Sequence, residues 1–322
     1  MKLRLYERAD ALEVLRLWNI AGTAAGYAPL DAGKLDELLL AHPAFCGEST
    51  FVLEERGAIL GFAAGCTGDT LAQGAVRGYV SCVLLDETCD TAENTALLLG
   101  AVEDSFRAKG KSVAAVTFFN PLRLPWIIPG TDGHRHNNMP GIAKDIPLYE
   151  RMLALGYREA ATEMAMYLDL AAFAYPAAME ERAAKMAAQG YTVDWYKEGV
   201  HRGVDEMVAS LGNSMWDAEI PAAAHGGMRL LVGLSGDTVA GFTGPVYPTG
   251  RGYFAGIAVE ERYRGHGLGK LLFYRLCRAE KECGAQYMSL FTGIDNPAQN
   301  IYKEAGFTPR RYFAVMIKEL KS

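Results

Sequence analysis

The order of apolar and polar positions along the chain predicts strands and helices in alternation. Residues 3–7 alternate between apolar and polar types, as a short strand does, and Asp10 stands where it could cap the helical pattern that follows. Residues 50–62 form two apolar runs around a charged turn that contains glycine, which predicts a β-hairpin. The same arrangement recurs at residues 230–242. We infer that the chain contains an internal repeat.

The two copies of the repeat define the predicted domain organisation. The strand expected at residues 78–84 of the first copy matches residues 252–258 of the second copy. Between the copies, residues 171–190 are rich in alanine, with proline near the start and glycine at the end, which predicts a connecting helix. We therefore predict an α+β fold with two domains, residues 1–170 and residues 191–322.

A glycine-rich loop in the second copy carries the strongest functional signal. Residues 264–270 read Arg-Gly-His-Gly-Leu-Gly-Lys and stand between an apolar run at 253–259 and a helical pattern at 271–282. Glycines let successive backbone N–H groups turn toward one concavity, and the helix adds its unpaired first-turn amides and its positive dipole end. The spacing fits neither a Walker loop nor a dinucleotide fingerprint. Such a loop either merely links a strand to a helix or holds a pyrophosphate mainly through its backbone, with Arg264 and Lys270 on its flanks.

Two signatures connect the second copy with a known family. Residues 259–269 resemble the pyrophosphate loop of the GNAT N-acetyltransferases, which has the pattern Arg/Gln-x-x-Gly-x-Gly/Ala after a strand. Residues 296–307 resemble the second family signature, an asparagine followed six residues later by a tyrosine and then by Gly-Phe. The resemblance covers residues 192–320. Together with the repeat it implies two tandem GNAT-like domains, each a mixed, mostly antiparallel sheet flanked by helices, and acetyl-coenzyme A as the cofactor.

The first copy lacks the residues that carry this chemistry. Where the second copy has its glycine loop, residues 86–93 contain no glycine and four acids, which would repel a pyrophosphate. Met152 stands at the position that is Tyr302 in the second copy. We therefore expect the first domain to be a degenerate, non-catalytic copy that shapes the acceptor pocket.

An insertion at residues 121–145 occurs only in the first copy, and its length is typical of either a functional flap or a long surface loop. A His-x-His pair without a third ligand is poor evidence for a metal, so we favour solvation of a surface loop for its polar side chains. Those that a substrate could meet are His134, His136, Asn137 and Asn138.

The resemblance implies roles for residues of the second domain. The backbone of the strand before the loop is expected to bond the pantetheine arm and polarise the thioester, Asn296 to bond the arm, and Tyr302 to protonate the departing thiolate. The cofactor-binding residues so implied are Ile257, Ala258, Val259, Arg264, Gly265, His266, Gly267, Leu268, Gly269, Lys270, Asn296 and Tyr302.

The acceptor side of the site is less well determined. The strand position that is Glu in some relatives is Tyr253 here, which leaves water or Glu219 as the general base. Trp216 and Asp217 are candidates for binding a cationic amine, since they fall in the region that forms the acceptor side in this family. The alternatives are a core position for the tryptophan and a solvated loop position for the aspartate.

Composition and charge exclude several classes. The net charge of −6 offers no basic excess for binding nucleic acid. No apolar run approaches the roughly 18 residues of a membrane span, and the N-terminus has no apolar signal sequence, so we expect neither membrane insertion nor secretion. The six cysteines form no Cys-x-x-Cys pair and lack a histidine at zinc spacing. We expect a cytoplasmic enzyme without a metal.

The leading hypothesis is therefore an acetyl-coenzyme A-dependent N-acetyltransferase. Its C-terminal domain would transfer acetyl to a small-molecule primary amine by direct attack of the amine on the thioester. Two alternatives stay open, a coenzyme A-binding regulatory module without turnover and an acetyltransferase for protein lysines or N-termini. The sequence predicts neither the acceptor, nor the acyl-chain length, nor the oligomeric state.

Overall fold

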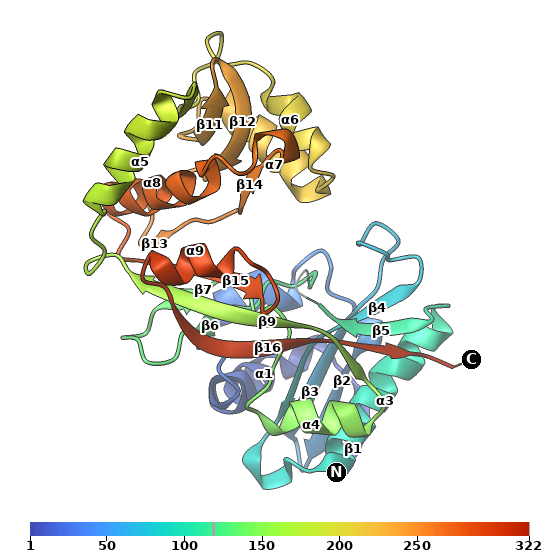
Figure 1. Cartoon of the computed structure of the whole chain (residues 1–322). Coiled ribbons are helices and arrows are strands. Elements are labelled where there is room, and N and C mark those ends of the chain that lie inside the picture. The colour runs from blue at the N-terminus through green and yellow to red at the C-terminus, as the bar shows by residue number, and fades with distance from the viewer. Residues whose placement is uncertain (118–119, 322) are drawn as a thin grey trace. The chain divides into compact units, whose positions relative to one another are not determined.

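The computed structural model describes residues 1–117 and 120–321, which form two compact units (Figure 1). Unit 1 consists of Met1–Ala165 together with Arg310–Ser322, and unit 2 consists of Met166–Pro309. Each unit contains sheets flanked by helices, which confirms the predicted α+β class. Among the described residues, no helix has both the length and the apolar character that crossing a membrane requires.

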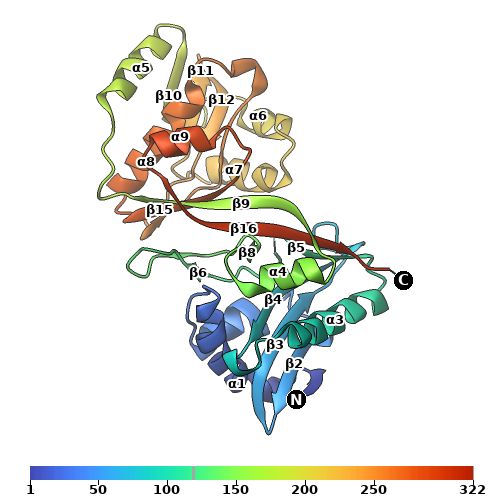
Figure 2. The ribbon, with the colours of Figure 1, turned by 60° about the horizontal axis from the view of Figure 1, so that its bottom comes forward.

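Unit 1 is built on one sheet with the strand order β1-β2-β3-β4-β5-β16-β9, and the short β8 pairs with β16 (Figure 2). The predicted hairpin is confirmed, because β2 and β3 are joined by Arg56 and Gly57, which both have positive φ as a tight hairpin turn requires. The strands are β1 (Lys2–Leu5), β2 (Thr50–Glu55), β3 (Ala58–Cys66), β4 (Arg77–Leu85), β5 (Val113–Val116), β8 (Ile142–Ala143), β9 (Arg158–Asp169) and β16 (Thr308–Glu319), and β6 (Trp126–Ile127) pairs separately with β7 (Arg135–His136).

Helices cover both faces of this sheet. Val102 and Phe106 of α3 pack on Ala63 of β3, whereas Leu84 of β4 lies next to Gly22 on the other face. Asp10 directly precedes α1, but its carboxylate binds Arg4 and a backbone N–H rather than capping the helix as predicted. The helices are α1 (Ala11–Leu17), α2 (Ala32–Leu35), α3 (Ala92–Ala108) and α4 (Pro147–Ala154).

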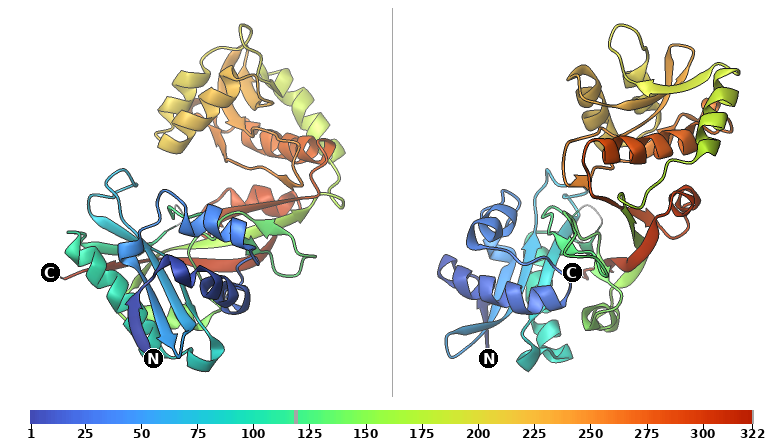
Figure 3. Two further views of the ribbon diagram at one scale, coloured as in Figure 1. Left: turned by 180° about the vertical axis from the view of Figure 1, so that it is seen from behind. Right: turned by 90° about the vertical axis from the view of Figure 1, so that its left-hand side faces the viewer.

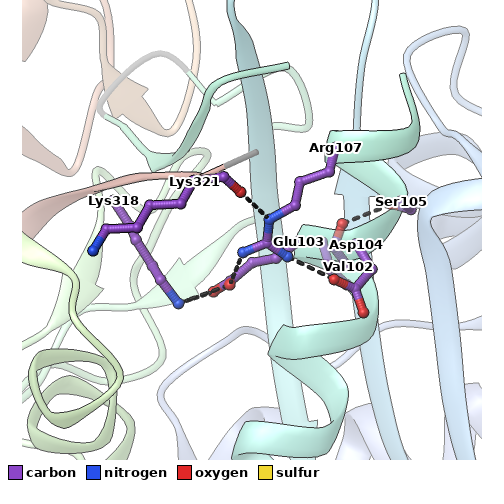
Figure 4. Close-up of polar contacts among 7 residues, drawn as sticks. All are labelled: Val102, Glu103, Asp104, Ser105, Arg107, Lys318 and Lys321. Carbon is purple, nitrogen blue, oxygen red and sulfur yellow. Dashed lines mark hydrogen bonds and ion pairs between the residues drawn. The ribbon is translucent and has the colours of Figure 1, made fainter. Parts of the chain in front are cut away.

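The last strand of the chain, β16, belongs to the sheet of unit 1. It pairs antiparallel with β5, and Lys318 Nζ donates to both carboxylate oxygens of Glu103 in α3 at 2.8 and 2.7 Å. Arg107 Nε donates to the carbonyl of Lys321 at 3.1 Å (Figure 4). The sequence analysis placed all of residues 191–322 in the second domain. That assignment was wrong for this strand. Its neighbours in the sheet are β5 and β9, which belong to the first copy and are distant from β16 in sequence.

Unit 2 contains a four-stranded antiparallel sheet, β10-β11-β12-β14, and a parallel pair, β13 and β15, with the end of β9 beside β15 (Figure 3). Val232 and Phe242 face α6 and α7, whereas Leu268 and Leu272 of α8 cover Gly233 on the opposite face. The strands are β10 (Tyr191–Trp195), β11 (Leu231–Ser235), β12 (Thr238–Thr243), β13 (Arg251–Gly252), β14 (Ile257–Val259) and β15 (Tyr287–Gly293), and the helices are α5 (Ala177–Ala187), α6 (Val204–Ser210), α7 (Ser214–His225), α8 (Leu268–Glu282) and α9 (Gln299–Glu304).

The strand registers confirm the internal repeat. Phe62 of β3 pairs with Leu84 of β4 in unit 1, and Phe242 of β12 pairs with Ala258 of β14 in unit 2. These are the positions that the two sequence copies align.

Two local interpretations for unit 2 were wrong. The strand expected over residues 253–259 is interrupted, because Gly256 has a φ of 140° and the Trp216 ring packs on it so closely that a Cβ there would lie 2.6 Å away. A loop position was the alternative considered for Asp217, but this residue lies in the first turn of α7. Asn213 caps this helix by accepting the backbone N–H of Met215.

Candidate functional site

The glycine loop of unit 2 joins β14 to α8 through a 3-10 turn, Glu261–Tyr263. Gly265 and Gly267 have φ values of 85° and 88°, in the left-handed region where other residues are strained. Gly267 is also the N-terminal cap residue of α8, so the helix begins at Leu268, earlier than predicted. The unpaired first-turn amides and the positive dipole end of α8 therefore lie at the loop. This geometry suits a bound anion.

The strand that enters the loop has an open edge. On one side, β14 pairs antiparallel with β12, and no strand among the described residues pairs with its other side. Upstream, β13 pairs in parallel with β15. After Gly252 the chain no longer pairs with β15. The backbone groups of Ile257, Ala258 and Val259 therefore form an unpaired sheet edge. Such an edge can bond an extended ligand as an added strand would.

Tyr302 lies on α9 with its ring buried among aromatic side chains. Only 4 % of the residue is exposed, and its ring centroid is 4.8 Å from that of Phe273 and 5.9 Å from that of Phe254. Burial raises the pKa of Tyr302 to about 12, so the phenol keeps its proton at neutral pH. Asn296, by contrast, is exposed, and its Oδ1 accepts the backbone N–H of Ala298 just before the helix.

Two residues that the sequence analysis considered for the acceptor side are joined in the structure. The hydroxyl of Tyr253 donates to Glu219 Oε1 at 2.5 Å. Trp216 is half-buried, packs on the core of unit 2 and donates its indole N–H to the carbonyl of Ala255 at 2.9 Å. Asp217 is exposed on α7. The roles predicted for Trp216 and Asp217 in amine binding stay predictions.

Comparison with known proteins decides the family of this site. Residues 188–307 match the model of the acetyltransferase (GNAT) family. Unit 2 carries a GNAT acetyltransferase domain. The matched range includes the glycine loop, the open strand edge and Tyr302, and the family uses acetyl-coenzyme A in general. None of the curated proteins matches the sequence of this chain.

Solved structures share the fold over nearly the whole chain. A GCN5-related glucosamine N-acetyltransferase region of a fungal multi-domain β-N-acetylglucosaminidase is 15% identical with a TM-score of 0.70, and the match covers 98% of this chain but only 38% of that longer one. A GCN5-related N-acetyltransferase from Sphaerobacter thermophilus is 15% identical with a TM-score of 0.63, covering 100% and 96% of the two chains. A tandem GNAT protein from the clavulanic acid biosynthesis pathway is 18% identical with a TM-score of 0.59, covering 100% and 99%. At these identities the likeness establishes the fold alone.

The sequence analysis did not identify two residues of the GNAT domain that lie beside Tyr253. The ring of Tyr247 lies 5.2 Å from that of Tyr253, and burial, followed by the charge of Glu219, raises the pKa of Tyr247. Glu280 of α8 is fully buried, and its Oε1 accepts the backbone N–H of Tyr253 at 3.2 Å. In the sequence, Glu280 is one of several charged residues of an amphipathic helix, so no local signal distinguishes it.

Glu280 is a carboxyl group that burial keeps protonated. Its Oε2 has no hydrogen-bond partner among the described residues. Burial raises the pKa of Glu280 to about 8, although the hydrogen bond from Tyr253 and the charges of Arg251 and Arg229 lower it. At neutral pH this side chain is therefore mostly neutral, and it supports the segment that carries Tyr253.

A Glu280→Gln variant should gain stability over the wild type as the pH rises. In the unfolded chain Glu280 ionises near its ordinary pKa of 4.5, but in the folded chain it keeps its proton up to about pH 8. Wild-type stability should thus fall between these values, by ~1.4 kcal/mol per pKa unit of the shift. We expect the Tm difference between variant and wild type to grow from pH 5 to pH 9. A difference that stays constant with pH would contradict this.

In unit 1, the side chain of Asn120 occupies only the part of the β4 edge that directly follows its pairing with β5. Just beyond the pairing of β4 with β5, Asn120 Nδ2 donates to the carbonyl of Val80 at 3.1 Å, and Ser81 donates to Asn120 Oδ1 at 3.1 Å. Farther along β4, a cavity of about 210 Å³ has mainly aliphatic walls with Glu87 and Asp90 among its lining residues. These acids disfavour a phosphate.

The insertion of unit 1 is folded into the unit. Trp126 is 1 % exposed and packs edge-on against Phe313 of β16 at 5.1 Å, and its indole N–H donates to the carbonyl of Asn138. His136 is buried, so the interpretation as a solvated loop side chain was wrong for this residue. Within residues 1–117 and 120–321, no group of three metal-ligating side chains occurs. Met152, at the position equivalent to Tyr302, is fully buried in the core.

Proposed function

We propose that unit 2 transfers the acetyl group of acetyl-coenzyme A to the primary amine of a small molecule. The observation that carries this proposal is the continuity of the open β14 edge with the glycine loop. The backbone along residues 257–259 would bond the pantetheine arm, and the loop with the start of α8 would take the pyrophosphate. Arg264 is held beside this path, since its Nε donates to the carbonyl of Val259 at 3.0 Å.

The residues around this path supply both proton transfers of an acyl transfer. The attacking amine must lose a proton, and the carboxylate of Glu219 with its partner Tyr253 provides a base. The departing thiolate must gain a proton, which Tyr302 holds at neutral pH because burial raises its pKa to about 12. The amine attacks the thioester carbonyl directly, so no cysteine nucleophile is required.

Two competing functions have different chemical consequences. A coenzyme-binding regulatory module would bind acetyl-coenzyme A without turnover, whereas a protein acetyltransferase would accept lysine side chains or N-termini of peptides. The protonated Tyr302 and the candidate general base Glu219, hydrogen-bonded to Tyr253, favour turnover. The acids Glu219 and Asp217 favour a cationic acceptor.

A turnover screen separates these functions. The full chain would be incubated with acetyl-coenzyme A and a panel of amines, aminoglycosides, amino acids and lysine peptides, and the released thiol would be measured. Turnover with a small amine supports the proposal, and turnover with peptides alone favours the protein acetyltransferase. Tight binding of acetyl-coenzyme A without turnover of any acceptor favours the regulatory module.

A Gly267→Val variant should lose coenzyme A binding while the wild type binds one coenzyme per chain. The φ of 88° at Gly267 strains a β-branched residue by ~1–3 kcal/mol, and a Cβ there would lie 2.6 Å from Arg182 Nη1, so the side chain would also displace neighbouring groups of the loop. Calorimetry would measure both affinity and stoichiometry. The matched control is Gly236→Val, since Gly236 has a φ of 61° in the hairpin turn and open space around it. Retained affinity at Gly267→Val, or two equivalent sites, would oppose the proposal.

A further inference from the structure

The connecting helix α5 is fixed alongside α8 within unit 2. The two helices are in contact, and Figure 1 and the right-hand view of Figure 3 show α5 next to α8. Glu180 of α5 accepts hydrogen bonds from Arg278 at 2.9 Å and from Arg275 at 3.5 Å. Lys281 Nζ donates to the carbonyl of Phe173, just before α5, at 2.7 Å. These contacts set the position of α5 relative to the start of α8.

One side chain of α5 reaches the glycine loop. The guanidinium of Arg182 lies against Gly267, so that a Cβ at Gly267 would be 2.6 Å from Arg182 Nη1. The Nε of Arg182 is buried and has no hydrogen-bond partner among the described residues. A guanidinium carries five N–H donors, and a buried donor without a partner is costly. Arg182 is therefore placed to receive an acceptor that the protein itself does not supply.

A cavity of about 440 Å³ lies between α5 and the start of α8. More basic than acidic side chains line it. Arg182 and Lys185 line it from α5 and Lys270 lines it from α8, against the single carboxylate of Glu181, and His266 also lies in the lining. Lys270 forms an ion pair with Glu304, but neither Arg182 nor Lys185 has an ion-pair partner among the described residues. This concentration of positive charge stands out on a chain with a net charge of −6.

We propose that Arg182 and Lys185 bind phosphate groups of coenzyme A, which makes the connecting helix part of the cofactor site. This inference rests on the proposed function, because it needs coenzyme A at the adjoining glycine loop. The coenzyme carries a pyrophosphate and a ribose 3′-phosphate, and a guanidinium binds two phosphate oxygens at once. The cavity is within the size range of ligand pockets, so it has room for the phosphorylated end of the coenzyme.

Calorimetry of the full chain with coenzyme A and with dephospho-coenzyme A tests this inference. We expect Arg182→Ala and Lys185→Ala each to weaken coenzyme A binding about tenfold or more, the effect of losing a charged hydrogen bond. Arg182→Lys should retain part of the affinity, because lysine keeps the positive charge but lacks the planar guanidinium that binds two phosphate oxygens at once. The matched control is Arg202→Ala, which removes an exposed arginine of the same unit that pairs with Asp237.

The outcomes separate this inference from the proposed function. A loss for coenzyme A greater than that for dephospho-coenzyme A supports contact with the 3′-phosphate, and equal losses support contact with the pyrophosphate. Unchanged affinity in folded Arg182→Ala and Lys185→Ala variants would overturn the role of α5 and leave the proposed function intact. A wild type that binds no coenzyme A would overturn both.

Discussion

Replacing Tyr302 by phenylalanine is expected to lower kcat by about a hundredfold or more while coenzyme A affinity changes little. The substitution removes one oxygen atom and leaves the ring that packs against Phe273 and Phe254. Affinity and packing should therefore change by no more than ~0.5 to 1.5 kcal/mol, the worth of one hydrogen bond. The chemical step loses its proton donor, although a thiolate with a pKa of about 8.5 is a fair leaving group and keeps the loss at the small end.

The measurement is kcat of the variant beside its coenzyme A dissociation constant, with the acceptor found in the turnover screen. Tyr274→Phe is the matched control, because Tyr274 is a buried tyrosine of α8 whose pKa burial also raises. An unchanged kcat for Tyr302→Phe would leave Tyr302 as a packing residue of α9. A comparable loss in both variants would point to packing rather than proton donation.

A fragment consisting of residues 171–322 is expected not to fold into a soluble monomer. It would keep β16 but lose β5, the strand with which β16 pairs in unit 1. Phe313, Ala314 and Met316 of β16 are fully buried in the complete chain and would face water in the fragment. Exposing each of the two large side chains costs ~1.5 to 3 kcal/mol, and the unpaired strand edge favours aggregation.

Size-exclusion chromatography and thermal unfolding of the fragment would test this expectation. The control is co-expression of residues 1–170 with residues 171–322, which restores the partner of β16 and should give a soluble complex with one cooperative transition. A soluble fragment that unfolds cooperatively and binds coenzyme A as the full chain does would show that unit 2 folds without β5. The first domain would then be dispensable for folding of the site.

The sequence alone determined the features that depend on a few consecutive residues. The glycines at 265 and 267 predicted a loop with positive φ, because only glycine adopts that backbone without strain, and both residues have it. The charged turns with glycine predicted two hairpins, and their recurrence predicted the repeat that the strand registers confirm. The two family signatures, at 259–269 and 296–307, lead to the family whose model matches residues 188–307.

The tertiary structure decided whatever depends on partners far apart in the chain. Alternation of apolar residues marks β16 as a strand, but it does not encode that β5 of the first copy is its neighbour. The neutral state of Glu280 and the raised pKa of Tyr302 arise from burial, which a sequence position does not reveal. The hydrogen bond between Tyr253 and Glu219 and the approach of Arg182 to Gly267 likewise require helices packed against loops. Neighbouring residues determine the local backbone preference, whereas burial, charge pairing and strand pairing arise only when the chain has folded.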